Sequence, residues 1–150
     1  MKYNIIDSHV HIAASGKDNP ENYYWSKKFE NSAGFRILKA VKGWLFKTVT
    51  DEMLLHWVKS QVNESMTVDQ CVYYAFDEVY GIDGERQKHN TTMYVSNNYI
   101  RGLLRGNPKA LFGLSIHPYR PDAIEQLEEY EKDAVLCKWI PSSQMIDMNH

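Results

Sequence analysis

The chain has 150 residues, of which 43% are hydrophobic and 24% are charged, and its formal net charge is -2 at pH 7. This composition is typical of one soluble globular domain and argues against partners such as nucleic acid or anionic membranes. The start of the chain does not resemble a signal peptide, and no apolar run reaches roughly 20 residues, so a cytoplasmic protein is expected.

Four short β-prone segments alternate with helical patterns along the chain. The segments predicted to form strands are Tyr3–Ile6, Gln70–Phe76, Leu111–Ile116 and Ala134–Ile140. The segments predicted to form helices are Phe35–Lys47, Thr50–Met66, Thr92–Arg105 and Pro121–Lys132. This alternation predicts βαβ units, and therefore an α/β fold with a parallel sheet and right-handed crossovers.

Three segments carry more detailed expectations. The run QCVYYAF is continuous and apolar, which is typical of a strand buried on both faces. The helix of residues 35–47 has a stripe of Leu38, Val41 and Leu45 beside basic side chains, and we expect it to cover the surface of the domain. Residues 13–32 are polar and are expected to form a long loop.

The chain has two cysteines, Cys71 and Cys137, which is too few for a disulfide framework or a Cys-rich zinc module. They fall on the second and fourth predicted strands. If the strands lie in chain order, the third separates the two thiols by two strand spacings, about 9.6 Å, which is too far for an undistorted disulfide. Both cysteines are therefore expected to be reduced core residues.

Two histidines follow the first predicted strand, in the sequence NIIDSHVHI. Side chains alternate along a strand, so His9 and His11 point the same way, about 6.6 Å apart along the chain. Two imidazoles at that spacing can converge on one metal ion about 2.1 Å from each nitrogen. A neighbouring carboxylate such as Asp7 could orient one ligand imidazole. The pair could also occur by chance at a strand end, but the α/β context favours a site for a divalent metal, with zinc as the expected ion.

The motif IIDSHVHI resembles the first-strand motif of the amidohydrolase superfamily of metal-dependent (β/α)₈ barrels, in which both histidines bind the metal. The closer resemblance is to its amidohydrolase-related branch (amidohydrolase 2), which contains hydrolases and some metal-dependent decarboxylases. Further residues that match that branch are Pro108, Phe112–Gly113, Pro118 and Asp122–Ala123. The resemblance implies the first four βα units of a TIM-type barrel with its helices outside. Residues 1–150 would form one partial domain with a helical insertion at about residues 13–50.

Two related families share the opening histidines. In TatD-type nucleases the third strand also ends in His-Pro, as at His117–Pro118 here. Those nucleases carry a metal-binding Glu in the fourth strand, where this chain has CKWIP, which argues against that branch. PHP-type phosphoesterases show further His and Glu ligands on their second and third strands, which Asp77, Glu78 and His117 match only weakly.

Lys138 lies inside the apolar fourth strand, and lysines are rarely buried without a partner. In some amidohydrolase branches a lysine on this strand becomes carboxylated and bridges two metal ions, so the resemblance offers Lys138 a role as a metal ligand. The alternatives are a lysine paired with a carboxylate inside the barrel, or one that extends toward the barrel mouth.

Other candidate site residues follow the second and third strands, where (β/α)₈ barrels place catalytic and substrate-binding groups. His117 could bind substrate or act as a general acid or base, or it could cap a loop. Asp77, Glu78 and Arg86 could bind a small-molecule substrate, or they could belong to a solvated loop.

The resemblance implies a hydrolase in which a metal-activated water attacks a small organic acid, lactone, amide or ester. A metal-dependent decarboxylase of the same superfamily is the alternative. Catalytic zinc usually has three protein ligands, and the family takes its further ligands from strands 5, 6 and 8. The chain is therefore expected to be the N-terminal half of a longer enzyme and inactive alone, unless His117 or His150 substitutes.

A half-barrel would expose open sheet edges, which is unfavourable for an isolated monomer. A homo-oligomer or the missing C-terminal half could cover those edges. The alternative from another functional class is a non-enzymatic half-barrel that binds a metal or a partner chain.

Overall fold

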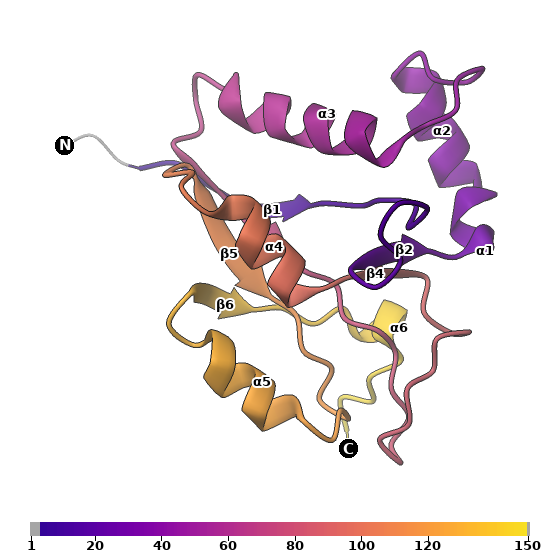
Figure 1. Ribbon diagram of the computed structural model, residues 1–150, viewed down its shortest axis with the longest axis vertical. Helices are drawn as coiled ribbons and strands as arrows, with labels where there is room; N and C mark the ends of the chain where they lie inside the picture. Colours follow the sequence, from indigo (N-terminus) through magenta and orange to yellow (C-terminus); the bar gives the residue numbers. More distant parts are fainter. Residues whose placement is uncertain (1–3, 150) are drawn as a thin grey trace.

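A four-stranded parallel sheet organises the computed structural model of the protein, which describes residues 4–149 (Figure 1). Its strands are β1 (Ile6–His11), β3 (Gln70–Tyr74), β5 (Ala110–Leu114) and β6 (Ala134–Cys137). They lie in the order β1-β3-β5-β6, and each neighbouring pair is parallel. The prediction of an α/β fold with a parallel sheet is therefore confirmed, and the strands lie in chain order.

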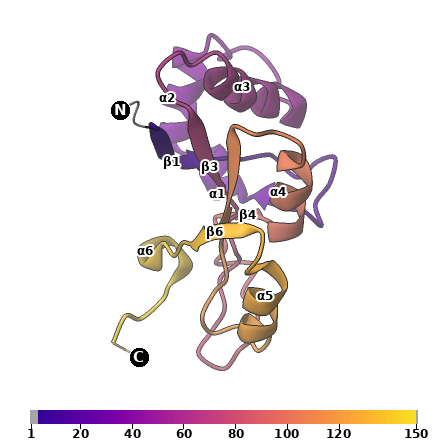
Figure 2. The same cartoon turned by 90° about the vertical axis from the view of Figure 1, so that its left-hand side faces the viewer.

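Three helices connect these strands and share one hydrophobic core with them. They are α3 (Asp51–Asn63), α4 (Asn97–Leu104) and α5 (Ala123–Tyr130). Figure 2 shows α4 and α5 on one side of the sheet and the short helix α6 (Pro141–Gln144) on the other. All three connecting helices are shorter than the sequence predicts, because their flanking residues form caps, turns or a short strand.

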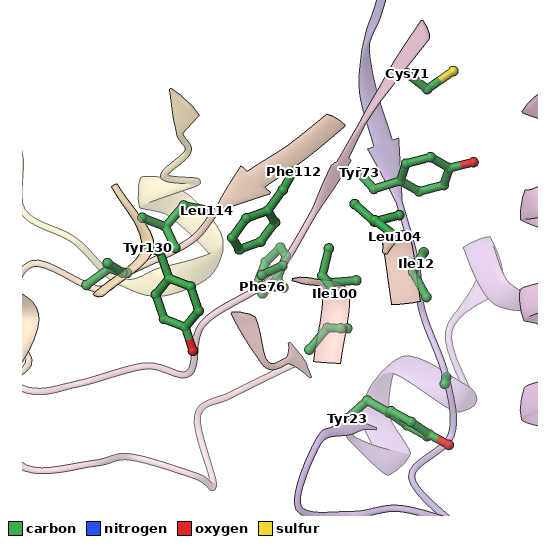
Figure 3. Packing of buried hydrophobic residues seen from close by; sticks show 14 of the residues in the cluster. Ile12, Tyr23, Cys71, Tyr73, Phe76, Ile100, Leu104, Phe112, Leu114 and Tyr130 are labelled. Carbon is green, nitrogen blue, oxygen red and sulfur yellow. The ribbon is translucent and has the colours of Figure 1, made fainter. Parts of the chain in front are cut away.

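The two faces of the sheet carry different side chains. Figure 3 shows Tyr73 of β3 and Phe112 of β5 among apolar side chains, with Ile100 and Leu104 of α4 nearby. Every residue from 71 to 76 is buried, which confirms the prediction made from QCVYYAF. Because side chains alternate along a strand, the neighbours of these core residues point to the other face of the sheet. That second face carries the candidate site.

The first and last strands differ from their predicted ranges. β1 begins at Ile6 and includes both histidines, because its ladder with β3 continues to His11. Tyr3, the predicted start, lies outside the described residues. β6 ends at Cys137, ahead of the predicted Ile140. Both cysteines are free, as expected, and β5 lies between their strands, but only Cys71 is buried. Cys137 is exposed because β6 is an edge strand, so its predicted place in the core is wrong.

The segment after β1 is not the long loop that the sequence predicts. It contains β2 (Tyr23–Trp25) and α1 (Lys27–Glu30), and β2 pairs antiparallel with β4 (Met93–Val95). All three residues of β2 are buried, so burial of this aromatic run outweighs the polar character of its surroundings. A bridge from Phe76 to Val95 ties this small sheet to the end of β3.

The helix predicted for residues 35–47 is α2 (Ala33–Val41). It stops before Gly43, whose φ of 66° lies in the left-handed region that favours glycine. Phe35 is buried in a cluster with Trp25 and Leu54, whereas Val41 is exposed. The predicted stripe is therefore wrong beyond Leu38, because the chain turns away before Leu45 can follow it.

The outer strands of the parallel sheet each have one partner within residues 4–149, since β1 and β6 stand at the two ends of the strand order. Large apolar side chains at these edges are exposed, among them Ile6 on β1 and Val135 on β6. Of the helices in that described range, none is long and apolar enough to cross a membrane.

Candidate metal centre

β1 brings the two histidines together at its carboxyl end. The register between β1 and β3 shifts between Asp7 and Val10, so one extra residue of β1 is accommodated at Ser8 and His9. His11 then pairs with Tyr74 of β3. The Nε2 atoms of His9 and His11 lie 3.1 Å apart.

Lys138 reaches the same place from the opposite edge of the sheet. Its Nζ lies 2.7 Å from Nε2 of His9 and 3.2 Å from Nε2 of His11. Its backbone N–H donates to the carbonyl oxygen of Leu114 at 2.8 Å, which fixes the residue directly after β6. The structure therefore unites three of the predicted site residues in one cluster of nitrogen atoms.

Tyr74 and Gly113 make this contact across the sheet possible. Tyr74 pairs with Gly113 in the β3–β5 ladder, and a Cβ atom added to Gly113 would lie only 2.5 Å from the Tyr74 ring. The ring therefore occupies the space that a side chain on β5 would need. The Nζ of Lys138 lies 4.6 Å from the centroid of the Tyr74 ring, a cation–π distance. The Tyr74 ring thus supports both the two histidine rings and the ammonium group of Lys138.

The contact also implies a curved sheet. β1 and β6 are separated by three strand spacings, which is about 14 Å in a flat sheet. Side chains stand roughly perpendicular to a sheet, so groups on strands this far apart meet only if the sheet curves toward the face that carries them. His9 and Lys138 meet on the face opposite α4 and α5, and this face is therefore concave.

The hydrogen-bond options of the cluster are limited. A lysine ammonium only donates, so each Nε2 atom that it contacts must offer a lone pair. In that state His9 and His11 both carry their proton on Nδ1, and no proton lies between the two Nε2 atoms. The lone pairs of the two Nε2 atoms then face each other, and a cation that contacts both nitrogens stabilises this arrangement.

Partial burial and nearby positive charge disfavour protonation of His11. Burial, the charge of Lys138 and His9 lower the pKa of His11 from 6.5 to about 4. Burial also lowers the pKa of Lys138 below its ordinary value. His11 is consequently a neutral imidazole at physiological pH, which is the form that binds metal ions.

The two imidazoles suit a transition-metal ion. Zinc binds imidazole nitrogens at about 2.1 Å in tetrahedral geometry, which places two ligand nitrogens about 3.4 Å apart. The separation of 3.1 Å between the Nε2 atoms is close to this value. The residues present therefore fit two ligands of such an ion. Within residues 4–149 there is no cluster of three or more His, Cys, Asp or Glu side chains that could hold a metal.

Asp7 lies beside the histidines, and its side chain contacts the backbone of His9. Its Oδ1 accepts the backbone N–H of His9 at 3.0 Å. Asp7, His9 and His11 also line a groove of about 370 Å³ between β1 and α3. The sequence predicts a bond from Asp7 to an imidazole ring, and the bond found here instead holds the irregular backbone that positions His9.

Asp77 and His117 lie in a buried network at the carboxyl ends of β3 and β5. Asp77 accepts the backbone N–H of His117 at 2.7 Å and forms an ion pair with Arg120 at 3.0 Å. Burial raises the pKa of Asp77, and Arg120 opposes that rise. The His117 ring is fully buried: its Nε2 contacts the carbonyl oxygen of Gln144 at 2.8 Å, and its Nδ1 accepts the N–H of Tyr119. These bonds give His117 a structural role, and its predicted catalytic role stays a prediction.

Glu78 and Arg86 form a second, partly buried ion pair, in which Arg86 contacts both carboxylate oxygens of Glu78. The hydroxyl of Tyr24 donates to the same carboxylate, so β2 is joined to the end of β3. Glu78 is buried, whereas half of the Arg86 side chain is exposed. Two of the three residues predicted to bind substrate, Glu78 and Arg86, are therefore brought together, and the role of all three, Asp77 included, in binding substrate stays a prediction.

Sequence reasoning missed Tyr74, Gly113, Arg120 and Tyr24. Tyr74 and Gly113 could have been found once the strand order was assumed, because their registers align them with His11. Arg120 lies in the loop before α5 and Tyr24 in the short strand β2, and the partners of both depend on how the chain turns, for which the sequence carries no spacing signal.

Comparisons with known proteins leave the site to be interpreted from its geometry. No protein-family model, no curated protein and no solved structure matches the chain.

Proposed function

We propose that the chain forms part of a metal-dependent hydrolase of the amidohydrolase type. The observation that carries this proposal is the 3.1 Å separation of the His9 and His11 Nε2 atoms at the carboxyl end of a parallel strand. Catalytic groups of α/β barrels are built at that end of the strands. The motif IIDSHVHI resembles the first-strand motif of that superfamily, and it supports the same assignment.

In this proposal His9 and His11 hold a divalent metal ion, with zinc as the expected species. Such an ion supplies a Lewis acid and a water molecule of lowered pKa. The chain's own residues hold the imidazoles: Asp7 fixes the backbone of His9, and the Tyr74 ring lies 5.6 Å from that of His11, between centroids. The expected substrate is a small organic acid, lactone, amide or ester.

The concave face of the sheet supports a barrel-like arrangement. Four parallel strands that curve inward would form one half of an eight-stranded barrel, which is the size at which the interior is just filled by side chains. The remaining metal ligands would then come from the other half, supplied by a longer chain or a second subunit.

A zinc-dependent assay tests the proposal. The protein is stripped with a chelator, reloaded with Zn²⁺ and assayed on small esters and lactones. In the assembly that also supplies the remaining ligands, a longer chain or a second subunit, we expect hydrolysis that requires zinc and is lost in His9→Ala and His11→Ala. His56→Ala is the matched control, because His56 is an exposed histidine of α3 outside the cluster. Zinc-independent turnover, or turnover unchanged in His9→Ala, would contradict the proposal.

A second candidate function is a half-barrel that binds a metal or a partner chain without catalysis. The exposed edges β1 and β6 favour it, because an open strand edge is a template for pairing with another chain. Zinc binding without hydrolysis, even in the assembly that supplies the remaining ligands, would favour this second candidate over the first.

A further inference from the structure

Lys138 holds the position between the two imidazoles that a metal ion would need. Its Nζ lies 2.7 Å from Nε2 of His9 and 3.2 Å from Nε2 of His11, and those two atoms are themselves 3.1 Å apart. The three nitrogens form a nearly equilateral triangle. A cation bound to both imidazoles through the same lone pairs cannot coexist with the ammonium in that place.

We infer that Lys138 is a built-in competitor for the metal site and must leave the imidazoles before a metal ion binds. This inference rests on the proposed metal site, and it adds a mode of regulation to it. An ammonium group has no lone pair and cannot act as a ligand. It donates to His9 and His11 and so stabilises the pair of imidazoles in their metal-free arrangement.

The surroundings allow both positions of the lysine. A cation–π interaction with the Tyr74 ring, whose centroid lies 4.6 Å from Nζ, stabilises the ammonium in its place beside the imidazoles. Lys138 is only half-buried, and it directly follows the edge strand β6, whose residues Val135 to Cys137 are exposed. The side chain can therefore swing toward solvent without displacing a core residue.

The competition predicts how substitutions change zinc affinity. Lys138→Met keeps a flexible side chain of similar length and removes the competing charge, so it should bind Zn²⁺ about tenfold to a hundredfold more tightly than the unchanged protein. That range corresponds to one hydrogen bond that involves a charged group. Lys138→Arg keeps a cation at the site and should not bind more tightly.

Isothermal titration calorimetry with Zn²⁺ alone tests this, with circular dichroism to confirm that each variant is folded. Lys132→Met is the matched control, because Lys132 is an exposed lysine in the turn before β6. It should leave the affinity unchanged. Equal or weaker zinc binding by Lys138→Met would overturn the competition while leaving the metal site in place, and weaker binding would assign Lys138 as a ligand. If neither the unchanged protein nor Lys138→Met binds zinc, the proposed function itself fails.

Discussion

The imidazole of His11 is held in its neutral form by its neighbours. Burial, Lys138 and His9 lower its pKa from 6.5 to about 4. In metal-free protein we expect the His11 ring to titrate near pH 4, as followed by NMR. Because the unfolded chain binds this proton at higher pH, the free energy of unfolding should fall as the pH drops from about 6.5 to about 4. An NMR titration of His11 centred near 6.5 would contradict this description of the cluster.

The carboxylate of Asp77 is the most connected buried charge near the strand ends. It is 3% exposed, pairs with Arg120 and accepts the backbone N–H of His117. Asp77→Asn leaves Arg120 without its buried counter-charge and should destabilise the protein by about 3 kcal/mol in urea unfolding. Asp18→Asn, at an exposed aspartate, should change stability by less than about 0.5 kcal/mol. A loss below about 1 kcal/mol for Asp77→Asn would show that the network is not required for the fold.

Residue identity predicted part of this site. The spacing of His9 and His11 pointed to a shared metal because alternation in a strand is a local rule. Lys138 stood out because a lysine in an apolar strand needs a partner. The sequence does not predict which groups meet at the strand ends. Glu78 contacts Arg86 and Tyr24, and Asp77 pairs with Arg120. These contacts depend on turns of the chain that have no simple periodicity.

At the scale of elements, the packing of β5 against β3 depends on one small residue. A Cβ on Gly113 would lie 2.5 Å from the Tyr74 ring. Gly113→Ala should therefore destabilise the protein by about 1 to 3 kcal/mol and displace the ring that supports Lys138. Gly102→Ala is the contrast, because Gly102 lies in α4 and, apart from the helix's own nearby backbone, an added Cβ would meet nothing within 4 Å. It should stabilise the protein by about 0.5 to 1 kcal/mol. Urea unfolding of both variants measures the difference, and a Gly113→Ala variant as stable as the unchanged protein would contradict the close packing.

The element predictions succeeded where periodicity was strong and failed where tertiary contacts decided. The buried run of β3 and the α3 helix, whose cap Thr50 accepts the N–H of Met53, follow from local pattern. β2 and β4 are three residues each and exist because they pair with one another, and such short partners have no local signature.

For the molecule as a whole, the two open edges are the features most exposed to other chains. Val135 of β6 is 53% exposed, and Ile6 of β1 is 46% exposed. We expect the protein to self-associate with rising concentration, and Val135→Lys to reduce this, because a charge on an edge strand opposes strand pairing. Val41→Lys is the matched control on the exposed face of α2. Sedimentation velocity measures the degree of self-association. If Val135→Lys and Val41→Lys associate to the same degree, β6 is not the edge through which the protein associates.

Zinc K-edge X-ray absorption of the zinc-loaded protein tests most directly whether His9 and His11 bind one divalent ion, as we propose. We expect two imidazole nitrogens at about 2.1 Å from zinc, with the imidazole signal lost in the His9→Ala and His11→Ala double variant. A shell that contains only oxygen, or an imidazole signal that survives the double substitution, would contradict this proposal.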